Sequence, residues 1–196
     1  MPLWAGLTGQ GSRVGMVPVG HLFDDTGSYR TMYDELTIRS LTAEDGHSAV
    51  AVINAAAEWY QEFLSPPELH NPEMTEEDWS VEARRMTWYG AFFEAELVGV
   101  MGLEYIETVA LFRHAYVLPR YQRRGVALAL HQHLERQVKG AEKIIVGTYA
   151  ANYKARSVLE KAGYRLSTDS RTVLRTYFDI PNDRLQSSVT YEKTVS

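Results

Sequence analysis

One strand, helix and strand unit in the second half of the chain constrains the fold more than any other feature. Residues 109–118 form a β-rich run, and Pro119 marks a turn directly after it. From residue 124 to 139, apolar side chains recur four positions apart, and Gly140 follows as a helix stop. Residues 143–146 are a short apolar run, typical of an interior strand buried on both faces. This order predicts a βαβ unit with parallel strands and a right-handed crossover.

The segments before this unit predict two helices and the first strands of the same sheet. Thr42 and Thr75 each precede a helical pattern as N-cap residues, and Thr75 has the spacing of a capping box. The elements expected here are a strand at residues 35–39, a helix over 49–59, a long loop over 61–74, a helix from 75 to about 86, and strands at 88–94 and 97–106 that form an antiparallel meander with 109–118.

The segments after the unit predict two more helices and two more strands. Gly163 is suited to the left-handed position that ends a helix. The expected elements are a helix over 152–162, a strand at 164–168, a short helix at 171–177 and a closing strand at 187–192. The fold class is therefore an α/β domain of the α+β type, with a mixed, mostly antiparallel central sheet, a parallel βαβ crossover and flanking helices.

Length and glycine content indicate one domain with an extension. A chain of 196 residues can bury one sizeable core and is short for two ordinary domains. Residues 1–33 are rich in glycine and show no sustained hydrophobic period. We expect residues 1–33 to be a flexible N-terminal extension and residues 34–196 to be the folded domain.

Charge and cysteine content exclude several classes of partner and chemistry. The net charge of -5 provides no global positive field for nucleic acid or for an anionic membrane. The absence of cysteine excludes disulfides, thiolate zinc sites and a cysteine nucleophile. No long apolar run or basic leader is present, so we expect a soluble, cytoplasmic protein.

A basic, glycine-containing loop precedes the helix of the βαβ unit. Gly125 allows the backbone to approach a ligand closely, and the first turn of the following helix has free N–H donors. Four arginines lie near this loop, although basic residues also favour a simple solvated turn; they are Arg113, Arg120, Arg123 and Arg124. The loop is a candidate phosphate site.

A second motif follows about thirty residues later, and together the two resemble a known superfamily. This part of the chain resembles the GNAT superfamily of acyl-CoA-dependent N-acetyltransferases in the order of its elements. They are a strand, V-x-P, Q/R-x-x-G-x-G/A, an amphipathic helix, an apolar strand and N-x-x-A-(x)-L-x-K-x-G-Y. The resemblance covers about residues 34–194 and is strongest over 113–164. It implies an N-acetyltransferase domain that uses acetyl-CoA as co-substrate and no metal.

The resemblance also implies which residues contact the cofactor. Ala115, Tyr116 and Val117 would line the pantetheine arm, and Asn152 would lie near it. Asn152 can equally serve as a simple N-cap of its helix. The residues that would surround the pyrophosphate are Arg123, Arg124, Gly125, Val126, Ala127 and Leu128.

Two positions depart from the superfamily pattern. Leu159 stands where many members have a tyrosine that protonates the leaving thiolate. Gly147 stands where members that acetylate protein N-termini have a glutamate. The expected function is transfer of an acetyl group to a primary amine of a small molecule or peptide, and the alternative is a catalytically silent acyl-CoA-binding or regulatory module.

The candidates for the general base lie on the two strands before the loop. His114 is one candidate, because an ordinary imidazole titrates near neutrality, and Glu104 could serve if its environment raised its pKa. His70 in the long loop is a third candidate. The ordinary alternatives are a core histidine and a solvated carboxylate.

Other side chains support weaker hypotheses. His131 and His133 point to different sides of their helix, so we expect no metal site there. Four aromatic residues either line an acceptor pocket or belong to the core; they are Trp59, Tyr60, Phe63 and Trp88. The expected partners are the amine acceptor and, as a candidate assembly, a second copy of the chain in a homodimer, with neither nucleic acid nor membrane.

Overall fold

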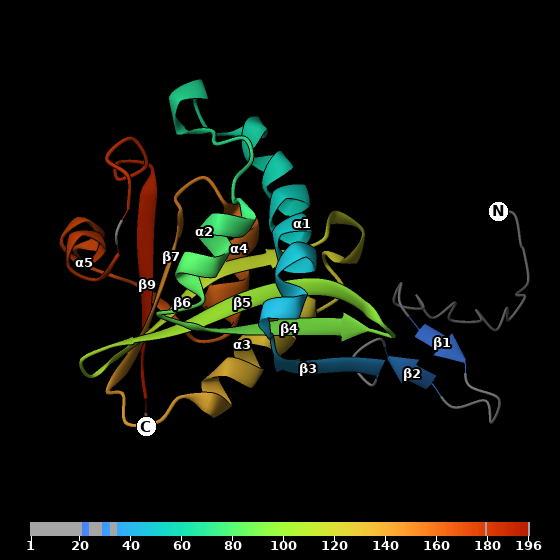
Figure 1. The fold of residues 1–196 in the computed structure, drawn as a ribbon. Coiled ribbons are helices and arrows are strands. Elements are labelled where there is room, and N and C mark those ends of the chain that lie inside the picture. The colour runs from blue at the N-terminus through green and yellow to red at the C-terminus, as the bar shows by residue number, and fades with distance from the viewer. Residues whose placement is uncertain (1–20, 24–28, 32–34, 179, 196) are drawn as a thin grey trace, which may run out of the picture.

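A seven-stranded mixed sheet forms the centre of the protein in the computed structural model, which describes residues 21–23, 29–31, 35–178 and 180–195 (Figure 1). Its strand order is β3-β4-β5-β6-β7-β9-β8, and every pair is antiparallel except β6 with β7. The predicted fold class is confirmed. The strands are β3 (Leu36–Ser40), β4 (Thr87–Phe93), β5 (Glu96–Ile106), β6 (Val109–Val117), β7 (Lys143–Tyr149), β8 (Arg165–Leu166) and β9 (Ser188–Thr194).

Helices cover both faces of this sheet (Figure 1). The helices α1 (Gly46–Ala57) and α2 (Glu76–Glu82) pack on one face, in a core that includes Trp79, Trp88 and Val100. On the other face, α3 (Val126–Gln137) and α4 (Tyr153–Lys161) pack in a second core with Met101 and Phe112. We call these the α2 face and the α3 face.

The helix α5 (Ser170–Tyr177) covers a third, smaller apolar cluster. Val173 and Tyr177 of this helix lie against Leu111 of β6 and Ile145 of β7. Leu111 and Ile145 are fully buried. The central parallel pair is therefore shielded from water by helices on both sides, as its apolar sequence predicted.

The parallel strands β6 and β7 stay together over only part of their length. Among the described residues their pairing runs from Val109 with Lys143 to Phe112 with Val146. Beyond these positions β6 continues to Val117 along β5, and β7 continues to Tyr149 along β9. We call this separation the strand split, formed by residues 113–117 of β6 and 147–149 of β7. Its backbone edges carry N–H and C=O groups that pair with no other described strand on the split side.

A β-bulge lies at the start of the split. The register between β5 and β6 shifts between Val100 and Gly102, and His114 has a φ of 52°. One extra residue therefore stands in β6 at this point, and a bulge changes which side chains share a face. Arg113 reaches Glu104, and His114 stacks on Trp88, so both side chains lie on the α2 face.

Local capping explains where several helices begin. At α2, the Thr75 hydroxyl accepts a hydrogen bond from the Asp78 N–H at 3.1 Å, and the Asp78 carboxylate accepts one from the Thr75 N–H at 2.9 Å. The predicted capping box is confirmed. Gly163 after α4 has a φ of 87°, which confirms the predicted left-handed position.

Several element boundaries differ from the sequence prediction. The first long helix ends at Ala57 and continues as a 3-10 turn, Glu58–Glu62, and α2 ends at Glu82 rather than near Met86. The predicted loop 61–74 contains a further 3-10 turn, Pro66–Glu68, which Ser65 and two prolines favour. Edge strand β8 has two residues because only Arg165 and Leu166 pair with β9.

The predicted flexible extension, residues 1–33, falls largely outside the described residues. Within it, β1 (His21–Phe23) and β2 (Tyr29–Thr31) form a separate two-stranded antiparallel sheet that the sequence analysis did not predict. The flexibility of residues 1–33 stays a prediction.

Candidate functional site

The loop before α3 has the backbone geometry expected of a phosphate site. Arg123 has a φ of 61° and Gly125, the N-cap of α3, has a φ of 86°. The Gln122 side chain donates a hydrogen bond to the Val117 carbonyl at 3.1 Å and so fixes the loop against the end of β6. The first-turn N–H groups of α3 lack intrahelical acceptors, and the helix dipole adds positive potential there. This arrangement fits an anion such as a pyrophosphate.

The side chains in this loop divide into exposed and packed ones. Arg123 and Arg124 are exposed, and the Arg124 guanidinium lies 5.7 Å from the centre of the Tyr121 ring. Val126 is buried in the core of the α3 face, and Ala127 and Leu128 are half-buried. Packing of Val126 anchors the first turn of α3, which leaves its backbone donors as the groups that can face a ligand.

The three residues predicted to line the pantetheine lie on the β6 side of the strand split. Ala115 is exposed and Val117 is half-buried, so their backbone is accessible at this edge. Tyr116 is buried, and its hydroxyl donates to a Glu73 carboxylate oxygen at 3.2 Å. The Tyr116 side chain therefore lies on the α2 face, and its backbone is the part at the edge.

Asn152 and Leu159 have clear structural roles in α4. The Asn152 side-chain oxygen accepts a hydrogen bond from the Ala155 N–H at 3.0 Å, so its role as N-cap is confirmed. Leu159 is almost fully buried in the core of the α3 face. This position consequently offers no proton donor.

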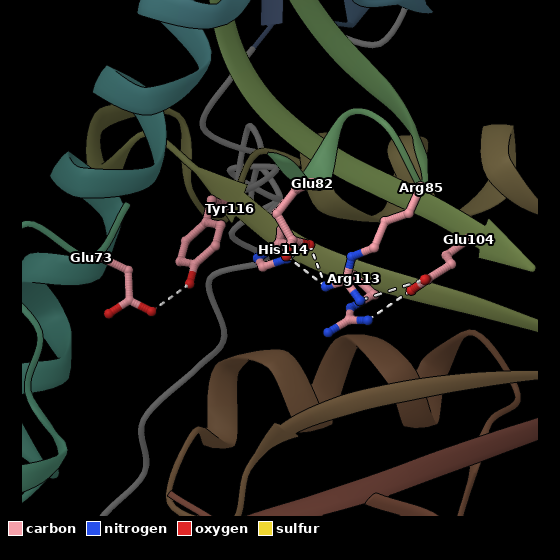
Figure 2. Close-up of polar contacts among 7 residues, drawn as sticks. All are labelled: Glu73, Glu82, Arg85, Glu104, Arg113, His114 and Tyr116. Atoms are coloured by element: carbon pink, nitrogen blue, oxygen red, sulfur yellow. Dashed lines mark hydrogen bonds and ion pairs between the residues drawn. The ribbon is translucent and has the colours of Figure 1, made fainter. Parts of the chain in front are cut away.

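His114 is held by two contacts on the α2 face, and Figure 2 shows the one with Glu82. Its Nε2 lies 3.1 Å from a Glu82 carboxylate oxygen, and its ring stacks on Trp88 with centroids 5.2 Å apart. The His114 side chain is 23% exposed, so the ring remains within reach of solvent. Burial opposes ionisation of Glu82, but its hydrogen bonds with His114 and Arg85 outweigh burial and lower the pKa of Glu82 to about 2.

Glu104 lies on the same face in a different set of contacts (Figure 2). One carboxylate oxygen accepts a hydrogen bond from Arg113 at 2.7 Å, and the other lies 3.6 Å from Arg85. The side chains of Glu104 and Arg113 are almost completely buried. Both carboxylate oxygens thus face guanidinium groups, which favours a role in holding the arginines.

A buried cluster of tyrosines and one ion pair lies beside the split. Tyr60 contacts both Tyr116 of β6 and Tyr149 of β7, with ring centroids 6.2 Å and 5.1 Å apart. The Arg184 guanidinium donates two hydrogen bonds to Glu73, at 2.9 Å and 2.8 Å, and one to the Glu68 carbonyl at 2.9 Å. This pair connects the loop after α1 with the segment before β9.

Burial governs the acidity of these tyrosines. It raises the pKa of Tyr60 to about 12 and raises the pKa values of Tyr116 and Tyr149 well above the ordinary value. All three hydroxyls therefore remain protonated near neutral pH.

The remaining predicted residues lie elsewhere. Trp88 is a core residue. Trp59 is half-buried, with the Lys154 ammonium 3.6 Å from its ring centre and an edge contact with Phe63. The His70 imidazole lies 3.9 Å from the carboxylate of Asp183.

The histidines of α3 have separate surroundings. His131 is buried between Phe112 and Tyr164, where burial lowers its pKa to about 4, and His133 lies against Tyr89. In the described part of the chain, no three or more histidine and acidic side chains come together as metal ligands. No helix among the described residues is long and apolar enough to cross a membrane.

The sequence analysis assigned no role to four charged residues of this region. Glu82 is the last residue of α2, and Arg85 lies three positions later in the turn that follows, a spacing that favours pairing with each other. Nothing local indicated that Glu82 would meet His114. Glu73 and Arg184 are 111 positions apart, so only the folded chain reveals their pair.

Comparison with known proteins gives one family and many similar structures. The model of the acetyltransferase (GNAT) family matches residues 53–164, more than half of the chain. No curated protein matches the chain in sequence.

Three solved structures represent the structural similarity. PaiA N-acetyltransferase from Thermoplasma acidophilum, in complex with coenzyme A, is 21% identical over 81% of this chain and 98% of its own, with a TM-score of 0.63. The ribosomal-protein-S18-alanine N-acetyltransferase from Escherichia coli is 18% identical over 82% and 94%, with a TM-score of 0.61. A GNAT acetyltransferase from Staphylococcus aureus is 14% identical over 82% and 99%, with a TM-score of 0.65. At these identities the likeness shows the fold.

Proposed function

The chain belongs to the acetyltransferase (GNAT) family, and on that premise we propose that it transfers an acetyl group from acetyl-CoA to the primary amine of a small molecule or peptide. The observation that carries this proposal is the position of His114, a partly exposed histidine at the bulge where β6 separates from β7. Residues 34–196 form the N-acetyltransferase domain in this proposal.

The cofactor lies along the strand split and the start of α3. The backbone edge of Ala115, Tyr116 and Val117 would hold the pantetheine amides, which need strand-like donors and acceptors. The loop from Arg123 to Leu128 would hold the pyrophosphate, mainly through N–H groups of the first turn of α3. Asn152 contributes by fixing the start of α4 near the same edge. Acetyl-CoA supplies the activated acyl group.

The chemistry requires one proton acceptor on the protein. A neutral amine attacks the thioester carbonyl, the new C–N bond forms, and the C–S bond breaks with the electron pair leaving on sulfur. The proton released by the amine goes to His114, whose imidazole suits transfer near neutral pH. The departing thiolate takes a proton from water, since a thiol pKa near ~8.5 makes it a tolerable leaving group. A proton donor at the position of Leu159 is then not required.

His114 is preferred over Glu104 as the base. Glu104 is almost completely buried and both its carboxylate oxygens face arginines, so an incoming amine has little access to it. His114 retains exposed surface and lies closer to the split along β6.

Thiol release on a panel of amines tests this function. The full chain, supplied with acetyl-CoA, should release free thiol with at least one amine among amino acids, polyamines, aminoglycosides and peptides. His114→Gln should lower kcat by about 100-fold, within the range of general base catalysis, and leave acetyl-CoA affinity unchanged. His47→Gln is the matched control, because His47 forms an exposed pair with Glu76 at 2.7 Å. Binding of acetyl-CoA without thiol release from any amine would instead support the catalytically silent module.

A further inference from the structure

His114 is restrained at two different points. The Trp88 ring stacks on it with an interplanar angle of 28°, which fixes the plane of the imidazole. The Glu82 carboxylate, 3.1 Å from Nε2, fixes its rotation within that plane. A carboxylate can only accept a hydrogen bond here, so Nε2 carries the proton. Nδ1 forms no hydrogen bond with another described residue, so the lone pair of the neutral ring is on this nitrogen.

Glu82 is itself held in its ionised form. Arg85, in the turn after α2, donates to both of its carboxylate oxygens, at 2.6 Å and 2.7 Å. Its carboxylate is therefore fixed in position and negatively charged at every pH at which an amine acetyltransferase works. A fixed anion on one ring nitrogen stabilises the imidazolium that forms when the other nitrogen takes a proton.

The charge of Glu82 is balanced by a longer row of groups (Figure 2). Arg85 also approaches Glu104 at 3.6 Å, and Glu104 is bound by Arg113 at 2.7 Å. Among the described residues, each of these two acids is therefore in contact with at least one arginine. In the part of the chain that the structure describes, Glu82 at the end of α2 and the neutral Trp88 of β4 contact His114 directly. The charged groups next to that contact are Arg85, Glu104 and Arg113. Glu82 favours protonation of His114, and Arg85 opposes it.

We propose that Glu82 is a positioning residue that keeps His114 in the tautomer with Nδ1 as the proton acceptor, and that Arg85 limits how basic His114 becomes. The inference rests on the proposed role of His114 as the base. It assigns opposite effects to two neighbouring residues that are bonded to each other. A purely structural pair would affect stability in the same direction and leave the titration of His114 unchanged.

Titration of His114 by nuclear magnetic resonance tests this without knowledge of the acceptor. The full chain is labelled with ¹⁵N, and the His114 imidazole is assigned by its loss in His114→Gln. We expect the Nε2-protonated tautomer at high pH. In Glu82→Gln the pKa of His114 should fall by about one unit, and in Arg85→Gln it should rise by about half a unit to one unit. Glu76→Gln is the control, because Glu76 forms an exposed pair with His47 and should leave His114 unchanged.

The pH dependence of kcat/KM provides the second readout once an acceptor is known. The lower limb of the profile should move to lower pH in Glu82→Gln and to higher pH in Arg85→Gln, with thermal melts confirming that both variants fold. Three results would overturn this inference while leaving His114 as the base. They are pKa shifts of the same sign in the two variants, no pKa shift in either variant, and a neutral ring protonated on Nδ1. Full activity of His114→Gln would overturn the proposed base itself, so the two failures are distinguishable.

Discussion

Removal of the Arg184 guanidinium should destabilise the protein more than the loss of any surface ion pair. Arg184→Met leaves the Glu73 carboxylate buried without its cation, because the two side chains are only 10% and 9% exposed. Breaking a buried pair at one partner typically costs about 3–5 kcal/mol. Glu73 keeps the hydrogen bond from Tyr116, so we expect the lower end of this range, about 3 kcal/mol. For a chain of this length that corresponds to a fall in melting temperature of about 6–12 °C.

Calorimetry or urea unfolding followed by fluorescence measures this loss, and two further variants interpret it. The double variant Glu73→Gln with Arg184→Met should recover a large part of the stability, because no buried charge is left unpaired. Lys143→Met is the surface control, since Lys143 lies 4.0 Å from Glu192 with both side chains well exposed, and it should cost less than about 1 kcal/mol. Equal losses in Arg184→Met and Lys143→Met would refute the argument that burial makes the Glu73 pair costly to break.

Three further variants test the loop, the cap and the acid response. Gly125→Ala should weaken acetyl-CoA binding several-fold in calorimetric titration and destabilise the fold by about 1 kcal/mol, because a φ of 86° is unfavourable for a residue with a Cβ atom. Gly140→Ala has a similar backbone position, with a φ of 71° and open space around it, and should leave acetyl-CoA affinity unchanged. Asn152→Ala should lower the free energy of unfolding by about 1 kcal/mol in urea denaturation, through loss of the hydrogen bond to Ala155 N–H. Glu82 has a pKa of about 2 when folded and about 4.3 when unfolded, so its stabilising contribution is present above pH ~4.3 and is lost as pH falls toward 2. Acid unfolding of Glu82→Gln should therefore be less steep over that interval, and identical acid profiles would contradict the assigned pairing.

The sequence predicted those parts of the fold that depend on local chemistry. The capping box at Thr75, the cap at Asn152 and the left-handed Gly163 are set by side chains within three positions or by one residue's own backbone preference. The βαβ unit could be predicted equally well. Its apolar pattern changes from that of a strand to that of a helix after the turn at Pro119, and the helical pattern ends at Gly140. These features require no knowledge of distant partners.

The strand order at the C-terminal end could not be read in the same way. β9 follows β8 by more than twenty residues in the chain, yet it inserts between β7 and β8 in the sheet. Pairing of Val146 with Tyr191 and of Leu166 with the same Tyr191 decides this order. Tyr191 is almost fully buried between the two strands, so the choice depends on tertiary packing that no local pattern records.

The candidate site depends on one extra residue in β6. Ala110 and Phe112 face the α3 core, and strict alternation along a strand would place His114 in that core as well. The sequence analysis accordingly kept a core histidine as the ordinary alternative.

The bulge between Val100 and Gly102 shifts the phase of β6, so that His114 lies on the α2 face against Trp88 and Glu82. The register of β5 against β6 sets the position of this bulge, and the same strand leaves β7 directly after Phe112. A single change of register therefore places the histidine at the split and supplies its carboxylate partner, and this is the step at which the fold creates a candidate base.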